Sequence, residues 1–540
     1  MRGKKNFFTG ILLLTISGAA VKICGLLFKI PLVSIIGEDG MGYFNSAYVI
    51  YTFFYVLTTS GLPLGMSILI SGTGDPFLKR RYLRSALWSF GLLGLGVCLL
   101  LMLFPHQIAR LVGNEPASSC LKVMGFTLLF VCLAGAIRGY FQGEKNMLPT
   151  AVSQVVEAVF KTALGILFAY YAVQKGKEPY ETASYALFGI TVGSFISLVY
   201  LILRLSREKE LFRKQPGWKA PKGICKKLFS VVLPVSASSV VLSISSVLDL
   251  GMVMRRLQST GFTPEEANRM YGNYSGLAIP LFNLPPVLIA PIAAALVPHL
   301  TSALAERDSL KTKKLIGSAL KLTMLISAPC VSGLAVLAEP ILCLLFQEDA
   351  AVTAAPYLTL LAPSILFVAL FTAGSGLLQA CGKRNKPMIA IAVGVVFKQI
   401  SSYILIGKYG MTGAPIGTFI CYSAAALLIF CFAEKEGLLQ ISFSSVFFFP
   451  LLCGTLCGLA AKGTLWLVQG TGRIWQVLLP MLSGGTVYLI SALLTGCVDE
   501  EALSLLPMGS RLSGMLKKSL AEKNGVKNDG TSKQTDERAL

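Results

Sequence analysis

Two lysines interrupt the first long apolar run of the chain, where charged side chains are costly. Lys22 and Lys29 lie within the run from about Phe8 to Val33 and are seven residues apart. Seven residues are nearly two helical turns, so both ammonium groups would lie on nearly the same face of a helix. Charges inside a membrane usually serve a function, and ammonium suits the oxygen atoms of a phosphate. The spacing predicts a cationic stripe for a phosphate-bearing substrate, with snorkelling of Lys29 to the interface as the alternative.

Further charges lie in later apolar runs. Glu157 and Lys161 are four residues apart, in the order that favours an ion pair along one helix. We interpret them either as a functional pair or as neutralisation that lowers the cost of membrane insertion. Lys398 has no acidic residue one turn before it, so it needs a carboxylate on another helix or the substrate as its partner. Asp249 could pair with either lysine of the first run or bind a coupling cation.

Two stretches far apart in the sequence share one pattern. Arg138 to Lys161 reads RGYFQGEKNMLPTAVSQVVEAVFK, and Gly376 to Lys398 reads GLLQACGKRNKPMIAIAVGVVFK. In each copy a glutamine, Gln142 or Gln379, precedes the final lysine by 19 residues, with a basic polar turn and a proline between them. Each copy predicts the end of one membrane helix, a turn and the start of the next. A unit used twice is typical of transporters built from internal repeats.

The bulk composition predicts an all-α polytopic membrane protein. Of the 540 residues, 54% are hydrophobic and 14% are charged, which leaves too few charges to cover a soluble protein of this size. Apolar runs of about 20 residues, the length that crosses a bilayer, recur from end to end. The runs are continuous rather than alternating, which favours helices over strands. They predict about fourteen helices, the first two over about 8–33 and 43–70.

The basic residues predict the topology. The net charge of +21 does not indicate nucleic-acid binding, because Lys and Arg concentrate in alternate short loops between apolar runs. This alternation predicts that both termini are cytoplasmic, and an even number of helices per half predicts a parallel repeat. The predicted domains are an N-lobe over 1–204, a basic linker over 205–227, a C-lobe over 228–433, two extra helices over 434–497 and a polar cytoplasmic tail over 498–540.

The sequence gives no sign of an enzyme. The 13 cysteines and two histidines lack metal-type spacing, so we expect no metal site, disulfide framework or cofactor. A membrane glycosyltransferase or ligase would need positioned acids or bases. The acidic pairs of the predicted outer loops, Glu38-Asp39 and Glu348-Asp349, have no supporting histidine or metal-type cluster.

Several motifs resemble those of the multidrug/oligosaccharidyl-lipid/polysaccharide exporter superfamily. They are IIGEDGMGYFNSAYVIYTFF (Ile35 to Phe54), SGLPLGMS (Ser60 to Ser67), the first copy of the repeat, and LPPVLIAPIAAALVPHLT (Leu284 to Thr301). Within the superfamily the chain resembles the polysaccharide flippase branch, above all stage V sporulation protein B and its relatives, over nearly its whole length. The resemblance implies a fourteen-helix transporter with two six-helix lobes around a central cavity and two extra helices. It also implies alternating access that moves an undecaprenyl-linked sugar across the bacterial plasma membrane.

The resemblance also limits which residues carry over. In the related lipid II flippases, basic residues of the first helix line the cavity; Lys22 falls at one of these places and Lys29 is one residue from another. The basic residues of their helices 2 and 8, and the acidic residue at the start of helix 2, have no match here, since the second span begins Tyr43-Phe44-Asn45. We expect Lys22, Lys29 and Lys398 to face the phosphates of a peptidoglycan precursor.

The expected partners are the lipid-linked saccharide and membrane lipids, with cell-wall synthesis enzymes as a further candidate. The main rival is a cation-coupled drug antiporter of the same superfamily. Such a protein would need an unpaired carboxylate in an apolar cavity, and Asp249 is the candidate. A non-transporting scaffold is a third possibility, and buried charges at repeat-related places count against it.

Overall fold

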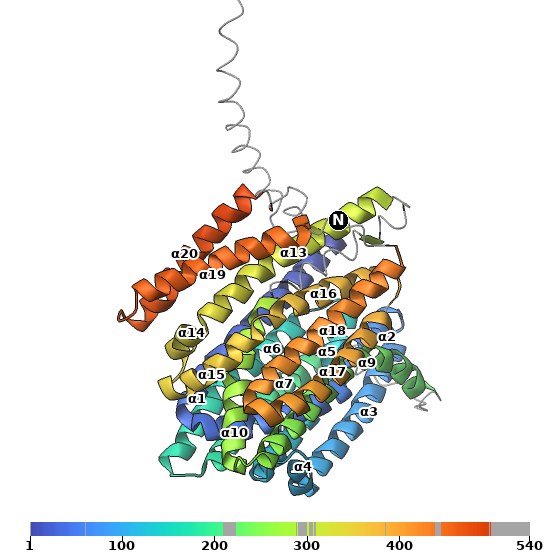
Figure 1. Ribbon diagram of the computed structural model, residues 1–540. Helices are drawn as coiled ribbons and strands as arrows, with labels where there is room; N and C mark the ends of the chain where they lie inside the picture. Colours follow the sequence, from blue (N-terminus) through green and yellow to red (C-terminus); the bar gives the residue numbers. More distant parts are fainter. Residues whose placement is uncertain are drawn as a thin grey trace, which may run out of the picture. The chain divides into compact units, whose positions relative to one another are not determined.

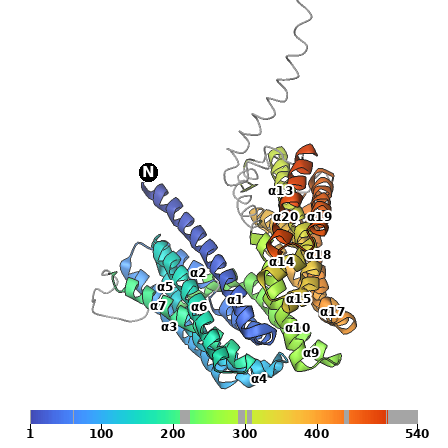
Figure 2. The ribbon, with the colours of Figure 1, turned by 90° about the vertical axis from the view of Figure 1, so that its left-hand side faces the viewer.

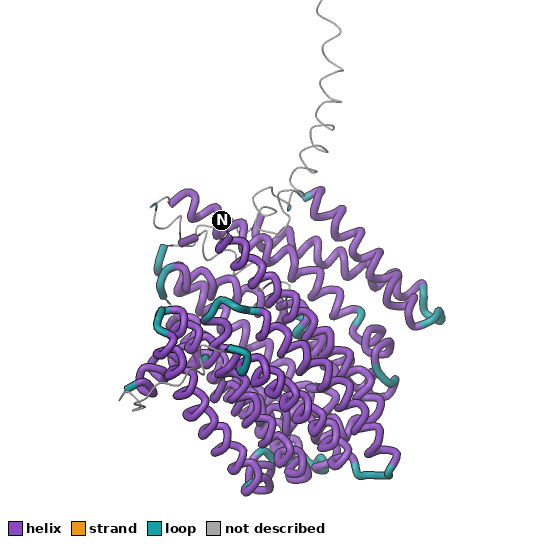
Figure 3. Tube along the Cα trace, turned by 180° about the vertical axis from the view of Figure 1, so that it is seen from behind, coloured by secondary structure: helices purple, strands orange, loops and turns teal. Residues whose placement is uncertain are grey.

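The computed structural model of this chain describes residues 2–59, 61–208, 223–287, 289, 300–301, 306, 309–383, 385–437, 444–495 and 497. Within these ranges the chain forms helices and short connecting turns, without a strand (Figure 3). Nine of the described helices are long and apolar enough to cross a membrane, or ten if one bent pair counts as a single span. The protein is therefore an all-α, multi-pass membrane protein, and the total of fourteen helices stays a prediction.

The chain divides into two compact units, each made of three segments. The first comprises Met1–Leu281, Leu345–Tyr357 and Val395–Gly417; the second comprises Phe282–Leu344, Leu358–Gly394 and Thr418–Leu540. The predicted domains rest on membrane topology rather than on compactness, and they stay predictions. Most of the predicted linker, the whole predicted tail and part of the fourth motif lie outside the described residues.

The first unit begins with a long, broken helix. α1 (Arg2–Thr59) covers the first predicted span and much of the second, and its break is a single residue, Gly37, with φ 67° and ψ −177°. A residue without a Cβ adopts this backbone conformation readily. α2 (Leu62–Ser71) forms a separate short helix where the sequence predicted one continuous span. Its proline, Pro63, lies in the first turn, where the missing N–H costs no hydrogen bond.

The remaining helices of the first unit follow in short order. They are α3 (Pro76–Leu103), α4 (Pro105–Leu111), η1 (Glu115–Ala117), α5 (Ser118–Gly143), α6 (Leu148–Gln174), α7 (Pro179–Leu205), α9 (Ile224–Ser259), α10 (Pro264–Asn273), η2 (Tyr274–Ala278), most of α11 (Ile279–Phe282), most of α15 (Glu348–Leu361), the C-terminal part of α17 (Asn385–Tyr409) and η3 (Gly410–Thr412). Figure 2 shows α5, α6 and α7 packed together in this unit, with α1 beside α6.

Glycines bring α6 and α7 into close contact. A Cβ on Gly189 of α7 would lie 2.3 Å from the Cα of Gly165 on α6. One turn further along α7, a Cβ on Gly193 would lie 2.8 Å from the backbone nitrogen of Lys161. Since no side chain separates the two backbones, this contact fixes the position of Lys161 on α6 relative to α7.

The two copies of the sequence repeat form the same helical hairpin. A four-residue turn joins α5 to α6, and a turn of the same length joins α16 (Ser364–Ala380) to α17. In each turn the backbone N–H of Lys145 or Gly382 donates to the carbonyl of Gln142 or Gln379 at 3.0 Å. The donor residue also has a positive φ in both copies, 59° at Lys145 and 77° at Gly382. The repeat predicted from the sequence is confirmed in the backbone of the turns.

The second unit carries the C-terminal helices. Its helices are α13 (Ser309–Val336), α14 (Ala338–Leu345), α16, the N-terminal part of α17, most of α18 (Gly413–Lys435), η4 (Ser444–Phe448), α19 (Phe449–Leu467) and α20 (Arg473–Leu494). α19 lies beside α20 and packs against α13 (Figure 1). The Tyr488 hydroxyl donates to the Leu325 carbonyl and ties α20 to α13. Large apolar side chains such as Trp466 remain exposed, as expected of helices that face lipid.

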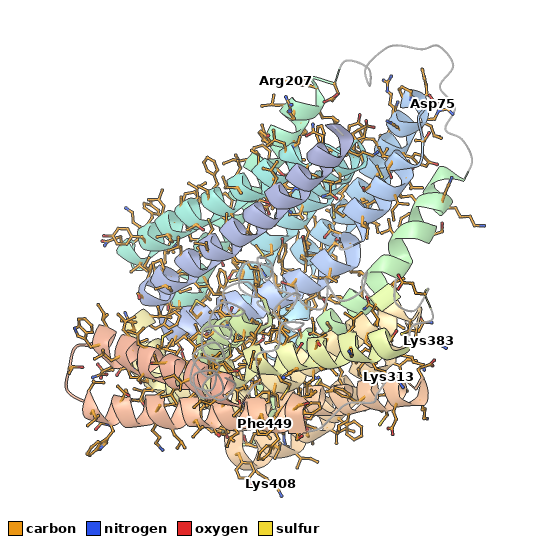
Figure 4. All side chains as sticks on the ribbon, turned by 90° about the horizontal axis from the view of Figure 1, so that it is seen from above. Asp75, Arg207, Lys313, Lys383, Lys408 and Phe449 are labelled. Carbon is orange, nitrogen blue, oxygen red and sulfur yellow. The ribbon has the colours of Figure 1, made fainter. Side chains whose placement is uncertain are left out.

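Loops that the basic residues assign to one membrane side lie together in the first unit. Figure 4 shows Asp75, before α3, and Arg207, after α7, at the same edge of this unit. Lys79, in the first turn of α3, forms an ion pair with Glu144 of the α5–α6 turn at 2.7 Å. Three predicted cytoplasmic loops of the first unit thus share one end. That this end faces the cytoplasm stays a prediction.

Candidate functional site

A cavity of about 370 Å³ lies inside the first unit, between α1, α5 and α6. Its polar lining consists mainly of three basic groups, a carboxylate, an amide and a phenol, namely Lys22, Arg138, Lys161, Glu157, Gln154 and Tyr55. This volume is within the range of about 300–1,000 Å³ found for small-molecule sites. Four of the residues selected from the sequence therefore meet around one space.

Arg138 is the centre of a buried hydrogen-bond network. Only 8% of its surface is exposed. Its Nε donates to Ser153 Oγ at 2.9 Å, and its Nη2 donates to Glu157 Oε2 at 2.8 Å and to Ser197 Oγ at 2.9 Å. Ser194 Oγ donates to the other oxygen of the Glu157 carboxylate at 3.2 Å. Because α6 and α7 supply the acceptors, three hydrogen bonds from two neighbouring helices hold the plane of the guanidinium that α5 carries.

The geometry of the α5–α6 hairpin explains why Arg138 lies next to Ser153 and Glu157. Arg138 and Ser153 are equally far from the centre of the turn, so they face each other across the two antiparallel helices. Glu157 follows one helical turn after Ser153, within reach of the long arginine side chain. The structure therefore differs from the expected pairing of Glu157 with Lys161. Among the described residues, the ion-pair partner of Glu157 is Arg138, a residue that the sequence analysis assigned only to the repeat motif.

Lys161 contacts aromatic rings rather than a carboxylate. Its Nζ lies 5.5 Å from the ring centroid of Phe28 and 5.3 Å from that of Tyr48, both on α1. Within the described part of the chain it has no ion pair. Cation–π contacts stabilise by roughly 0.5–2 kcal/mol and leave the N–H groups of the ammonium unused. Lys161 can therefore donate hydrogen bonds to a ligand in the cavity that it lines.

The two lysines of α1 have different surroundings. Lys22 is exposed and lines the cavity. Lys29 is half-buried and outside the cavity lining, and it lies close enough to Lys161 for the two ammonium groups to repel each other. Thr162 Oγ1 donates to the Cys24 carbonyl at 3.1 Å, between the two lysines, and joins α6 to α1. The cavity lining thus contains Lys22 and Lys161, with Lys29 next to Lys161.

Lys398 belongs to a second charge pair in the first unit. Its Nζ binds Asp249 Oδ2, and Gln399 Nε2 donates to Asp249 Oδ1 at 2.6 Å. The side chains of Lys398 and Asp249 are only 16% and 20% exposed. Of the two partners left open for Lys398, the structure shows a carboxylate on another helix, because α9 supplies Asp249. It does not show the alternative pairing of Asp249 with Lys22 or Lys29, and Lys398 does not line the cavity.

The repeat glutamines act through their backbones. The carbonyl groups of Gln142 and Gln379 accept the turn hydrogen bonds at 3.0 Å. Neither side chain forms a hydrogen bond with the described residues. The described residues also contain no group of three or more His, Cys, Asp or Glu side chains placed to hold a metal ion.

A polar cluster that the sequence analysis did not select joins α1 to α10. Arg269 donates to both carboxylate oxygens of Asp39, at 3.1 and 3.0 Å, and this hydrogen bonding raises the pKa of Arg269. Asn268 Nδ2 donates to the Asp39 carbonyl and Asn273 Nδ2 to Glu38 Oε2, both at 2.9 Å. The signal in the sequence was the acidic pair of Glu38 and Asp39 together with a capped helix rich in Asn and Arg. Only the fold shows that they meet.

Two family models match this chain. Residues 7–304 match the polysaccharide biosynthesis protein family, and residues 275–404 match the MatE family. The first match covers more than half of the 540 residues.

Curated proteins of Bacillus subtilis (strain 168) are similar over nearly the full length. An uncharacterized membrane protein, YabM, is 28% identical, covering 96% of this chain and 97% of its own. Stage V sporulation protein B is 23% identical, with 94% and 99% covered, and lipid II flippase MurJ is 22% identical, with 94% and 98% covered.

Solved structures share the fold at 18% identity. A lipid II flippase MurJ in an inward closed conformation has a TM-score of 0.70 and covers 89% of this chain and 98% of its own. An inward-facing multidrug resistance MATE family transporter has a TM-score of 0.66, with 79% and 98% covered.

Proposed function

Since this chain belongs to the polysaccharide biosynthesis protein family, in the polysaccharide flippase branch of the multidrug/oligosaccharidyl-lipid/polysaccharide exporter superfamily, we propose that it flips an undecaprenyl-pyrophosphate-linked saccharide. The protein is a transporter rather than an enzyme. The proposed substrate is a peptidoglycan precursor, lipid II, carried across the bacterial plasma membrane by alternating access. Both termini face the cytoplasm in this proposal, in agreement with the alternation of basic loops.

The observation that carries the proposal is the cavity with its two lysines. Lys22 and Lys161 lie on apolar helices, where an ammonium group without a counter-ion is costly. An anionic substrate would lower that cost, and its own desolvation cost would fall at the same time. Lys29 adds positive potential next to Lys161. Lys398 would act elsewhere, because Asp249 already binds it.

The rival function is cation-coupled antiport of drugs, which the fold also supports through its likeness to multidrug transporters. Such a transporter needs a carboxylate that can exchange a proton or sodium ion. The two carboxylates selected from the sequence, Glu157 and Asp249, each bind a basic side chain of the protein itself. A coupling ion would have to displace Arg138 or Lys398. This arrangement favours the flippase over the antiporter.

The proposal is tested with the full chain purified and reconstituted into liposomes that contain lipid II. The appearance of lipid II in the outer leaflet is followed for the native chain, for Lys22→Ala and for Lys462→Ala. Lys462 is a matched control, since it is an exposed lysine of apolar α19 in the second unit, outside the cavity. We expect the native chain and Lys462→Ala to accelerate translocation and folded Lys22→Ala to lose most of it.

Other results would overturn the proposal in identifiable ways. If Lys22→Ala translocates lipid II as fast as the native chain, the cavity does not carry the function. If the native chain leaves lipid II in place while a proton or sodium gradient drives a small cation through it, the antiporter reading replaces the flippase.

A further inference from the structure

We propose that Asp249 on α9 belongs to a monovalent-cation site that the protein fills with an ammonium group of its own, Lys398 on α17, in place of a dissolved coupling ion. We call Lys398 in this role the built-in cation. The filled site follows from the contacts alone. Its consequence, transport that needs neither sodium nor potassium, rests on the proposed function.

Side chains of α17 bind both oxygen atoms of the Asp249 carboxylate. Lys398 Nζ binds Oδ2, and Gln399 Nε2 donates to Oδ1 at 2.6 Å. Because these two residues are neighbours in the sequence, one turn of α17 brings a charge and an amide to the same acid. A dissolved cation would therefore have to displace one of these two groups to reach Asp249.

The carboxylate needs a positive charge where it lies. The side chains of Asp249 and Lys398 are mostly buried, and α17 belongs to a candidate membrane span. A carboxylate in such surroundings is costly unless a cation accompanies it. The Lys398 ammonium meets this need, since it is a compact group with a single positive charge.

The groups around the ammonium would also suit a dissolved cation. Tyr271 of α10 is buried and lies close enough to Asp249 and Lys398 to interact with both charges. Carboxylate, amide and hydroxyl oxygen atoms are the ligands that hard cations prefer. The Gln399 amide would present its oxygen instead of its nitrogen after a half-turn. Removal of the ammonium would thus leave oxygen ligands for sodium or potassium.

A built-in cation differs from a dissolved one because it cannot leave. The Lys398 ammonium is joined to α17 by its side chain, so it competes for Asp249 as an intramolecular partner at high effective concentration. Sodium and potassium compete only in proportion to their concentration in solution. We therefore expect Asp249 to stay occupied in the native chain whichever salt is present.

A second contact between α9 and α17 makes the site accessible to mutation. Arg256 Nε donates to the Tyr403 carbonyl at 3.1 Å, and the Arg256 guanidinium lies 4.3 Å from the centroid of the Tyr403 ring. Arg256 follows Asp249 by about two helical turns on α9. It therefore still joins the two helices beside the site when Lys398 is replaced.

The test measures thermal unfolding of the purified full chain in detergent, in chloride salts of sodium, potassium, propylammonium or choline at equal ionic strength. Lys398→Ala opens the site, and propylammonium replaces the atoms that this substitution removes. Lys398→Met is the matched control, because it removes the charge but fills the space. Lys161→Ala removes the repeat-related lysine, which has no ion pair within the described part of the chain. The double variant Lys398→Ala with Asp249→Asn also removes the carboxylate.

We expect the native chain to unfold at the same temperature in all four salts. Lys398→Ala should unfold at least about 1 °C higher in sodium, potassium or propylammonium chloride than in choline chloride. This is the shift expected for a chain of this size when the cation is about fivefold above its dissociation constant. The other variants should show no such difference. A native chain that sodium or potassium stabilises more than choline would overturn the proposal, as would folded Lys398→Ala that responds like the other variants.

Lipid II translocation in liposomes tests the consequence for coupling. The native chain should translocate equally fast in sodium and in choline, because its cation is built in. Lys398→Ala should be at least about fivefold slower in choline than in the cation that stabilises it, since its site is then empty. Equal rates of folded Lys398→Ala in these salts would overturn the proposal. A native chain that requires sodium would overturn it too, even where Lys398→Ala does not fold.

The built-in cation and the flippase can fail separately. If the unfolding temperatures follow the expected pattern while the native chain translocates no lipid II in any salt, the filled site stands and the proposed transport is wrong. If the native chain translocates lipid II only in sodium, the flippase stands and the built-in cation is wrong.

Discussion

The two repeat hairpins have the same backbone geometry in their turns, but the lysine that ends each copy has different neighbours. Lys161 ends the first copy of the motif, lies over two aromatic rings and lines a cavity. Lys398 ends the second copy and binds Asp249, which Gln399 also holds. The difference is therefore not in the fold of the hairpin but in which neighbouring group meets the ammonium.

Two small residues explain why the second copy lacks the arginine network. The offset that aligns the turns puts Ser375 at the place of Arg138 and Gly394 at the place of Glu157. A Cβ on Gly394 would lie 2.5 Å from the Cys421 carbonyl oxygen, so α17 approaches α18 too closely there for a longer side chain. In the first copy the close approach next to Glu157 is made by a glycine of the partner helix, Gly193 of α7, and α6 keeps its glutamate. The same close packing thus leaves room for a charge network in one copy only.

The largest loss of stability should come from replacing Glu157, the acidic residue that only the first copy has. Glu157→Gln leaves the Arg138 guanidinium buried without a counter-ion, and breaking a buried pair in this way costs about 3–5 kcal/mol. We expect a correspondingly lower free energy of unfolding in detergent. Glu181→Gln is the matched control, because Glu181 pairs with Lys177 at the surface and such pairs contribute about 1 kcal/mol or less. Equal stability of Glu157→Gln and the native chain would mean that another group balances Arg138.

Replacing Lys398 should destabilise the protein more than replacing Lys161. Lys398→Met leaves the mostly buried carboxylate of Asp249 without its cation, and we expect a loss of about 3 kcal/mol in unfolding free energy. Lys161→Met removes only cation–π contacts, so the loss should be about 1 kcal/mol or less. Lipid II translocation should show the reverse order, with Lys161→Met the slower variant. Two variants of equal stability would contradict the difference in partners.

Much of this comparison could be predicted from the sequence. The intervals between glutamine and lysine identified the hairpins, because a helix–turn–helix unit keeps its length when it is duplicated. The missing acid near Lys398 predicted that this lysine needs a partner from elsewhere, and Asp249 on α9 is that partner. Hydropathy identified membrane-spanning segments in both units. Inside a bilayer every backbone N–H and C=O must form a hydrogen bond within the protein, so a long apolar run is expected to form a helix.

The partners of each charge could not be predicted in the same way. Spacing along one helix favoured Glu157 with Lys161, but Arg138 reaches Glu157 across the turn, and three serine hydroxyls support this pair. Equal distance from the turn was a usable signal for Arg138 and Ser153. No such rule links Asp39 with Arg269, because they are 230 residues apart and only tertiary packing brings them together.

The turns offer a smaller test of the repeat. Lys145 adopts the left-handed conformation that Gly382 adopts in the other copy. A side chain in this conformation costs roughly 1 kcal/mol, so Lys145→Gly should stabilise the protein by up to about that amount. Gly382→Ala should destabilise it by a similar amount. Denaturant unfolding of both variants checks the pair, and effects of the same sign would show that the two turns are not equivalent.

The smallest expected effect concerns the ion pairs that each hairpin forms near its turn with another part of the chain. Glu144 in the first turn pairs with Lys79, whereas Lys386 and Lys383 of the second hairpin pair with Glu436 at 2.6 and 3.4 Å. The hydrogen bond from Lys386 lowers the pKa of the exposed Glu436 carboxyl below its usual value. A lowered pKa means that the stabilisation from these ion pairs is complete above the unfolded-state pKa near 4.5 and is lost as the pH falls through the folded-state value.

Thermal unfolding between pH 7 and pH 3 should therefore show a small acid-sensitive contribution that Glu436→Gln removes and that added salt weakens. An acid response that is the same in Glu436→Gln and the native chain would assign it to other carboxylates.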